Sequence, residues 1–162
     1  MMQDALDDFR ATIDAAAARL NELSEEEAQA ARADGKWSAK QIIGHLLDSA
    51  ANNHRRFVLA QLTDHLAFEG YAQNDWVRVQ HYEDEPWAQL VALWQAYNRH
   101  LLHVMAHTPT AKLEMPCTQH TLDRIAWQTV SQSEPVTLEY LMRDYIGHLK
   151  HHLRQVFNES AT

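Results

Sequence analysis

Four long stretches of this sequence carry apolar residues at spacings of three and four, which is the pattern of a helix with one apolar face. Few helix-breaking residues interrupt these stretches, because the 162 residues include only four Gly and four Pro. The pattern predicts helices over residues 3–23, 38–62, 86–107 and 137–157. We therefore expect an all-α protein.

Polar residues mark where these helices begin. Segments 24–27 and 38–41 each start with Ser and end with Glu or Gln, the spacing of a capping box that satisfies free N–H groups at a helix start. The first segment predicts only a short helical turn, because an Asp-Gly pair breaks the pattern soon afterwards. Pro86 suits a first helical turn, and Thr137 is a typical N-cap residue.

The connections between the predicted helices are uneven in length. Residues 64–85 are polar and aromatic without clear periodicity, and residues 108–136 alternate weakly, which is compatible with an extended loop or a short strand. Four helices of about 20 residues can bury their apolar stripes together. We therefore expect a four-helix bundle with long connections, formed as a single domain over residues 1–162.

Composition and charge exclude several classes of protein. The net charge is −8 and the Lys and Arg residues are dispersed, so we expect no nucleic-acid partner. No run of about 18 apolar residues could span a bilayer, and the chain starts with acidic residues, so we expect a cytoplasmic protein without membrane contact. The single cysteine, Cys117, cannot form an internal disulfide, and no motif pairs it with a base. We expect an inert thiol there, and a metal site would need nitrogen and oxygen ligands.

Histidine is abundant, with 11 residues, and two of them share one helical face. His148 and His152 are four residues apart in the last predicted helix, which places their Cβ atoms about 5 to 6 Å apart. Leu141, Tyr145 and Val156 lie on the same stripe, so this face turns toward the core. Two inward imidazoles need partners, which are either hydrogen bonds within the core or a metal ion that both bind.

A third histidine lies in the second predicted helix. His45 has Leu46 and Ser49 on neighbouring positions, so it belongs to a partly buried face. Alone it is typical of a hydrogen-bonded core histidine. Together with His148 and His152 it would supply three nitrogen ligands from two helices, the number that catalytic zinc sites commonly use while a further coordination position stays open.

Several short segments form a recognisable set in order along the chain. They are Lys36-Trp37-Ser38-Ala39, the run from Ile43 to Asp48, the pair Gly70-Tyr71, the segment Asp75-Trp76-Val77, and the run from Gly147 to Gln155 with its two ligand-spaced histidines. This set, which covers nearly the whole chain, resembles the DinB/YfiT-like family. The resemblance implies an up-down-down-up four-helix bundle, often dimeric, in which His45, His148 and His152 hold one divalent metal ion.

The resemblance also implies a class of reaction. The family includes metal-dependent hydrolases and enzymes that transfer low-molecular-weight thiols, such as bacillithiol or mycothiol, to electrophiles. We therefore expect a divalent-metal-dependent hydrolase or thiol S-transferase that acts on a small molecule and forms a homodimer. Imidazole ligands favour zinc or nickel, with iron or manganese as further candidates. The alternative is a non-catalytic metal-binding or stress-associated interaction protein in which the ion only ties two helices together.

Two aspartates lie one turn from the candidate ligands. Asp144 precedes His148 by four residues, and Asp48 follows His45 by three. Either carboxylate could orient an imidazole by accepting its second N–H group, and Asp144 could also be a fourth ligand. The interpretation that we favour for both is a solvated carboxylate.

The other histidines and the aromatic residues of the long connections have weaker signals. His151 is turned about 100° away from His152 and is expected beside the site or on the surface. Tyr71 and Trp76 lie in the long second connection, where we expect a pocket wall. The third predicted helix carries a further set with helical spacing, for which we favour a solvated face: His100, His103 and His107.

Overall fold

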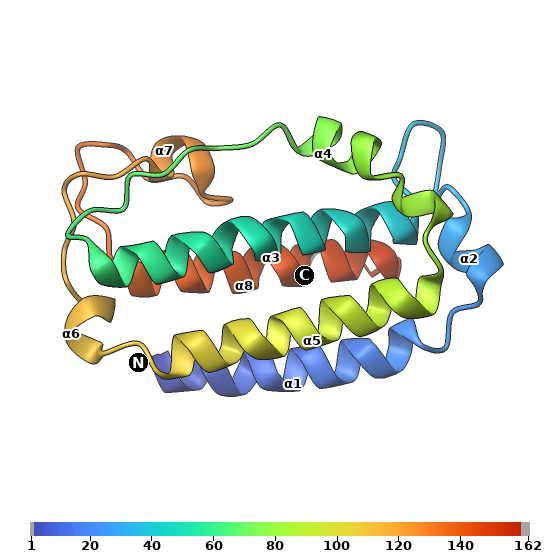
Figure 1. Ribbon diagram of the computed structural model, residues 1–162, viewed down its shortest axis with the longest axis horizontal. Coiled ribbons are helices and arrows are strands. Elements are labelled where there is room, and N and C mark those ends of the chain that lie inside the picture. Colours follow the sequence, from blue (N-terminus) through green and yellow to red (C-terminus); the bar gives the residue numbers. More distant parts are fainter. Residues whose placement is uncertain (1, 160–162) are drawn as a thin grey trace.

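The computed structural model describes residues 2–159, and its long elements are all helices (Figure 1). The four long helices are α1 (Met2–Leu20), α3 (Ala39–Leu62), α5 (Trp87–Ala106) and α8 (Leu138–Val156). The short helices are α2 (Glu25–Gln29), α4 (Gln73–Gln80), the 3-10 turn η1 (Tyr82–Asp84), α6 (Thr110–Leu113) and α7 (Leu122–Ile125). Residues 2–159 contain no β-strand, which confirms the all-α prediction. No helix among them is long and apolar enough to cross a membrane.

The four long helices form a bundle with up-down-down-up topology. In Figure 1, α1 runs from left to right, α3 and α5 both run back, and α8 runs in the direction of α1. Helix α3 packs against α5 and α8, and α1 packs against the same two helices. Because α3 and α5 are parallel, residues 63–86 must return the chain along the length of the bundle before α5 can begin. The predicted four-helix bundle is confirmed.

Capping side chains define the starts of the helices as the sequence predicts. Ser24 and Ser38 both form complete capping boxes, and the hydroxyl of Thr137 accepts a hydrogen bond from the backbone N–H of Tyr140. Inside the bundle each long helix contributes an apolar stripe. The largest fully buried side chains include Phe9, Phe57 and Trp94.

The long connections contain helices that the sequence pattern did not predict. Helix α4 buries only Val77, and no side chain caps its start at Ala72, so neither an apolar stripe nor a capping signal marks it. Helices α6 and α7 are single turns of four residues each, too short to show a helical period. The weak alternation in residues 108–136 produces isolated bridges instead of a strand, such as the one between Cys117 and Val136.

The two long connections lie together over α3 and α8, in the upper part of Figure 1. The backbone N–H of Leu66 donates to the carbonyl of Gln119 over 3.0 Å, and the N–H of Thr121 donates to the carbonyl of Leu66 over 3.2 Å. The hydroxyl of Thr121 also accepts from the N–H of Phe68 over 2.9 Å. Segments about 50 residues apart in the sequence thereby form one cover over α3 and α8. The candidate site lies beneath this cover.

Two glycines allow aromatic side chains of these connections to touch the long helices. A Cβ atom at Gly44 would overlap the ring of Tyr82, and one at Gly147 would lie 3.0 Å from Cζ3 of Trp127. These glycines directly precede His45 and His148. Because these glycines have no side chain, the covering segments can approach the long helices closely beside both histidines.

Candidate metal centre

The three histidines named from the sequence meet where α3 packs against α8. His45 comes from α3, and His148 and His152 come from successive turns of α8. One nitrogen of each lies within 4.8 Å of the others, and His45 Nε2 is 3.2 Å from His148 Nε2. Within residues 2–159, no other group of three His, Cys, Asp or Glu side chains converges in this way.

Burial keeps these three imidazoles neutral. Burial, aided by the nearby His152, lowers the pKa of His45 to about 3. The pKa of His148 is lowered to about 3 as well, by burial and then by the neighbouring histidines. Burial also lowers the pKa of His152, although its hydrogen bond to Gln155 opposes this shift. Neutral imidazoles keep the lone pair with which they bind a metal ion.

Hydrogen bonds turn two of the rings so that Nε2 faces the centre. His152 Nδ1 donates to the side-chain oxygen of Gln155 over 2.7 Å, which leaves Nε2 as the nitrogen with the lone pair. His148 Nδ1 lies 3.5 Å from the hydroxyl of Ser49. Partners of this kind hold metal-ligating histidines in position in other proteins.

The closest pair of these nitrogens has the spacing of metal ligands. Nitrogen ligands about 2.0 to 2.1 Å from a tetrahedral zinc ion lie about 3.3 Å from each other, and the closest pair here is 3.2 Å apart. His45 is fully buried and its Nδ1 has no hydrogen-bond partner among residues 2–159, so packing against Trp37, with ring centroids 5.1 Å apart, sets its orientation. A cation between these nitrogens would accept a lone pair from each imidazole in its neutral form.

Gln155 gives a direct test of this orientation. Replacing Gln155 by Leu removes the acceptor for His152 Nδ1, and we expect zinc affinity to fall by about 10- to 100-fold. Competition with a chromophoric chelator measures this affinity. Gln155→Glu, which keeps an acceptor oxygen, should retain wild-type affinity within a fewfold range, and equal affinity of the Leu variant would contradict the assigned contact.

The depressed pKa values predict how the stability of the metal-free protein depends on pH. An unfolded chain protonates His45 and His148 near pH 6.5, whereas the folded chain does so near pH 3. The unfolded state therefore binds more protons between these values, and stability falls by about 1.4 kcal/mol per pH unit for each histidine as pH drops below 6.5. Denaturant unfolding of wild type and His148→Gln measures the slope, which should be clearly shallower in the variant. Identical slopes would show that His148 is not the titrating group.

The two aspartates have other partners. Asp144 accepts hydrogen bonds from the backbone N–H groups of Trp127 and Gln128, over 2.8 and 2.7 Å, and so ties the connection after α7 to α8. Asp48 accepts from the hydroxyl of Tyr82 over 2.6 Å and from the amide of Gln80 over 2.7 Å. The expectation of a solvated carboxylate is wrong for Asp48, because this residue is only 3% exposed and burial raises its pKa. Both carboxylates hold covering segments in place, and neither bonds an imidazole.

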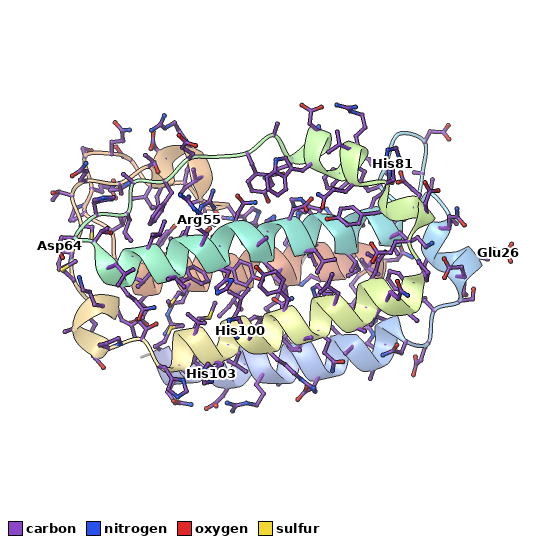
Figure 2. All side chains as sticks on the ribbon, in the orientation of Figure 1. Glu26, Arg55, Asp64, His81, His100 and His103 are labelled. Atoms are coloured by element: carbon purple, nitrogen blue, oxygen red, sulfur yellow. The ribbon has the colours of Figure 1, made fainter. Side chains whose placement is uncertain are left out.

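Cys117, His151 and the histidines of α5 lie as the sequence analysis expected, outside the set of candidate ligands. Burial raises the pKa of the Cys117 thiol, as expected for an inert cysteine. His151 packs against Trp127, with ring centroids 5.3 Å apart, beside the site. The three histidines on α5, which are His100, His103 and His107, are exposed. Figure 2 labels His100 and His103 on that helix, below α3 in this view.

A cavity of about 300 Å³ opens beside the histidine cluster, between α3, α8 and the two covering connections. His148 and His152 form part of its wall, and Tyr71 and Trp127 contribute from the connections. The expectation for Tyr71 is therefore confirmed. Trp76 does not line this cavity but packs against the ring of Tyr71, with centroids 5.0 Å apart.

Three residues of the site and its cavity were not predicted from the sequence: Gln155, which bonds His152, and the lining residues Arg56 and Arg124. Gln155 could have been found from its position three residues after His152, because that spacing places both on one helical face. Arg56 lines the cavity two helical turns beyond Ser49, but an arginine in a helix is ordinarily assigned to solvent. Arg124 comes from a connection without any periodicity that could have placed it.

Comparison with known proteins gives a consistent result. No curated protein matches the chain. YfiT from Bacillus subtilis, described as a probable metal-dependent hydrolase with an unusual four-helix bundle topology, has a similar structure with a TM-score of 0.74. The match covers 98% of this chain and 87% of that one at 18% identity, so the likeness is one of fold. The family described as the DinB superfamily matches residues 8–156. The chain thus belongs to the DinB superfamily.

Proposed function

We propose that this protein is a divalent-metal-dependent enzyme that acts on a small molecule, with His45, His148 and His152 as the metal ligands. The single observation that carries the proposal is the convergence of three neutral imidazole nitrogens, within 4.8 Å of one another, at the wall of a cavity. Zinc and nickel suit such a set best, and iron or manganese are further candidates. The similarity to YfiT, described as a probable metal-dependent hydrolase, supports this class.

Three protein ligands leave a coordination position for a substrate or water. When bound, a divalent ion with neutral ligands supplies Lewis acidity, which lowers the pKa of a water or thiol at that position. The side chains of this protein have two tasks: Gln155 and Ser49 orient the imidazoles, and the covering connections shield the cavity from bulk solvent. Hydrolysis of a small molecule and transfer of a low-molecular-weight thiol to an electrophile are the two reactions that we propose.

An activity screen separates these reactions. Zinc- and nickel-loaded protein would be assayed with esters and amides for hydrolysis, and with cysteine, glutathione and other small thiols paired with electrophiles for transfer. We expect turnover in one arm only, and loss of that turnover in His152→Ala. Turnover that persists in His152→Ala would refute the role of the histidine cluster.

The alternative is a non-catalytic protein in which the ion ties α3 to α8. A closed shell of protein ligands favours that alternative, whereas His148 and His152 both line a cavity here, which supports the enzyme. If the protein binds one metal ion per chain but shows neither hydrolysis nor thiol transfer in the screen, the non-catalytic alternative would be favoured. The expected homodimer stays a prediction, which light scattering of the purified protein checks.

A further inference from the structure

The cavity beside the histidine cluster contains a buried cationic side chain. Arg56 on α3 is only 4% exposed and lines this cavity. Its Nη2 donates to the backbone carbonyl of Glu69 over 2.8 Å, and its Nη1 donates to the side-chain oxygen of Asn53 over 3.4 Å. Both acceptors are neutral, and no Asp or Glu side chain in residues 2–159 forms an ion pair with Arg56.

A buried guanidinium without a counter-ion is incompletely satisfied. Arginine keeps its charge in proteins and presents five N–H donors in a planar fork, whereas Arg56 reaches only two acceptors among residues 2–159. Burying a charge is costly unless an opposite charge pairs with it. A carboxylate is the partner that this fork fits best, because its two oxygens accept two parallel hydrogen bonds.

Arg56 belongs to a row of polar side chains that leads to the histidine cluster. His148 Nδ1 lies 3.5 Å from the hydroxyl of Ser49, and this hydroxyl lies 3.3 Å from Nδ2 of Asn53, which in turn contacts Arg56. Ser49 and Arg56 are seven residues apart, about 10 Å along the helix. Because the side chain of Arg56 leans back toward Asn53, the guanidinium lies about 5 to 10 Å from the cluster along α3.

The other charges around this cavity do not neutralise Arg56. Arg124 adds a second positive charge from α7 at the exposed rim. Asp144 also lines the cavity, but both of its oxygens accept backbone N–H groups, those of Trp127 and Gln128. The cavity therefore favours an anion even though the chain as a whole carries a net charge of −8.

We propose that Arg56 binds a carboxylate of the substrate while the reacting group of the same molecule lies at the histidine cluster. The substrate is then a small carboxylic acid whose reacting atom lies about 5 to 10 Å from the carboxylate. A single buried guanidinium matches the single charge of a carboxylate better than a doubly charged phosphate. This inference rests on the proposed function, because it takes the histidine cluster as the reacting centre.

Thiol probes of defined length test the proposal on nickel-loaded protein. The probes are 3-mercaptopropionate, 6-mercaptohexanoate and 11-mercaptoundecanoate, each compared with the mercaptoalcohol of the same length. Calorimetry measures binding, and near-ultraviolet charge-transfer absorbance reports separately whether sulfur coordinates the nickel. We expect 6-mercaptohexanoate to bind at least about tenfold more tightly than its alcohol, since a charge-assisted bidentate pair replaces a neutral contact.

Three variants of two arginines, Arg56 and Arg55, assign the preference. In Arg56→Gln the preference for the acid over the alcohol should fall to within about twofold, while continued binding of the alcohol shows that the variant is folded. Arg56→Lys keeps the charge without the fork and should retain part of the preference. Arg55→Gln is the matched control, because Arg55, labelled in Figure 2, is the neighbouring arginine and is exposed. This variant should behave as wild type.

The outcomes separate this inference from the proposed function. Equal binding of acids and alcohols by wild type, binding of neither, or a preference that survives in Arg56→Gln would each overturn the role of Arg56. A calorimetric preference that depends on Arg56 but has no charge-transfer band would support the carboxylate site and count against the metal-based function.

Discussion

Replacing His148 or His152 by Ala should abolish stoichiometric metal binding. Each substitution leaves only two of the three converging imidazoles, and we expect affinity for zinc or nickel to fall by more than about 100-fold, beyond the loss typical of a residue that only supports a ligand. Elemental analysis of tag-free protein measures the effect directly. Wild type should carry close to one ion per chain, and both variants should carry almost none.

His103→Ala is the matched control for this experiment. His103 lies four residues before His107 on α5, with ring centroids 4.1 Å apart, and therefore copies the spacing of the pair on α8 in an exposed position. We expect His103→Ala to retain one ion per chain. Stoichiometric metal in both α8 variants, or its loss in His103→Ala alone, would overturn the assignment of the ligands.

Replacing Gly44 by Ala should destabilise the protein by about 3 kcal/mol, the upper range for overpacking a core. The new methyl group would overlap the ring of Tyr82. That ring cannot move aside easily, because Tyr82 is only 5% exposed and its hydroxyl donates to Asp48 over 2.6 Å. Denaturant unfolding measures the loss, and a second expected consequence is weaker metal binding, since Gly44 directly precedes His45.

A double-mutant cycle shows whether the Tyr82 ring is the cause. In a Tyr82→Ala background the space at Gly44 is free, so Gly44→Ala should be neutral or stabilising by up to about 1 kcal/mol, the gain in helix propensity. Gly147→Ala is a milder control, because the ring that it meets belongs to Trp127, which is 41% exposed and can shift. An undiminished cost of Gly44→Ala without the Tyr82 ring would rule out this steric explanation.

The bundle was predictable because its long helices carry their own signals. Apolar residues at helical spacing and the capping residues Ser38 and Thr137 indicate where α3 and α8 lie. The directions of the helices could not be predicted in this way. They depend on which helices pack together, and no local sequence pattern encodes that packing. The up-down-down-up topology came instead from resemblance to a family. Helix α4 was missed because burial of Val77 alone leaves no stripe to detect.

The candidate site was likewise predictable only in part from local sequence patterns. The pairing of His148 with His152 follows from helical spacing alone, whereas their approach to His45 depends on the contact between α3 and α8. The cavity wall depends on covering segments whose course follows from hydrogen bonds distant in sequence, such as those of Asp144. Arg56 was not predicted, because burial of a charged side chain runs against the usual preference of arginine for solvent.

Crystallography of the zinc-loaded protein with anomalous scattering at the zinc edge tests the central claim most directly. We expect one strong peak about 2.0 to 2.1 Å from a nitrogen of each of His45, His148 and His152, with a further coordination position facing the cavity. A peak at the exposed histidines of α5, or an ion enclosed by four protein ligands with no open position, would contradict the proposed metal-dependent enzyme.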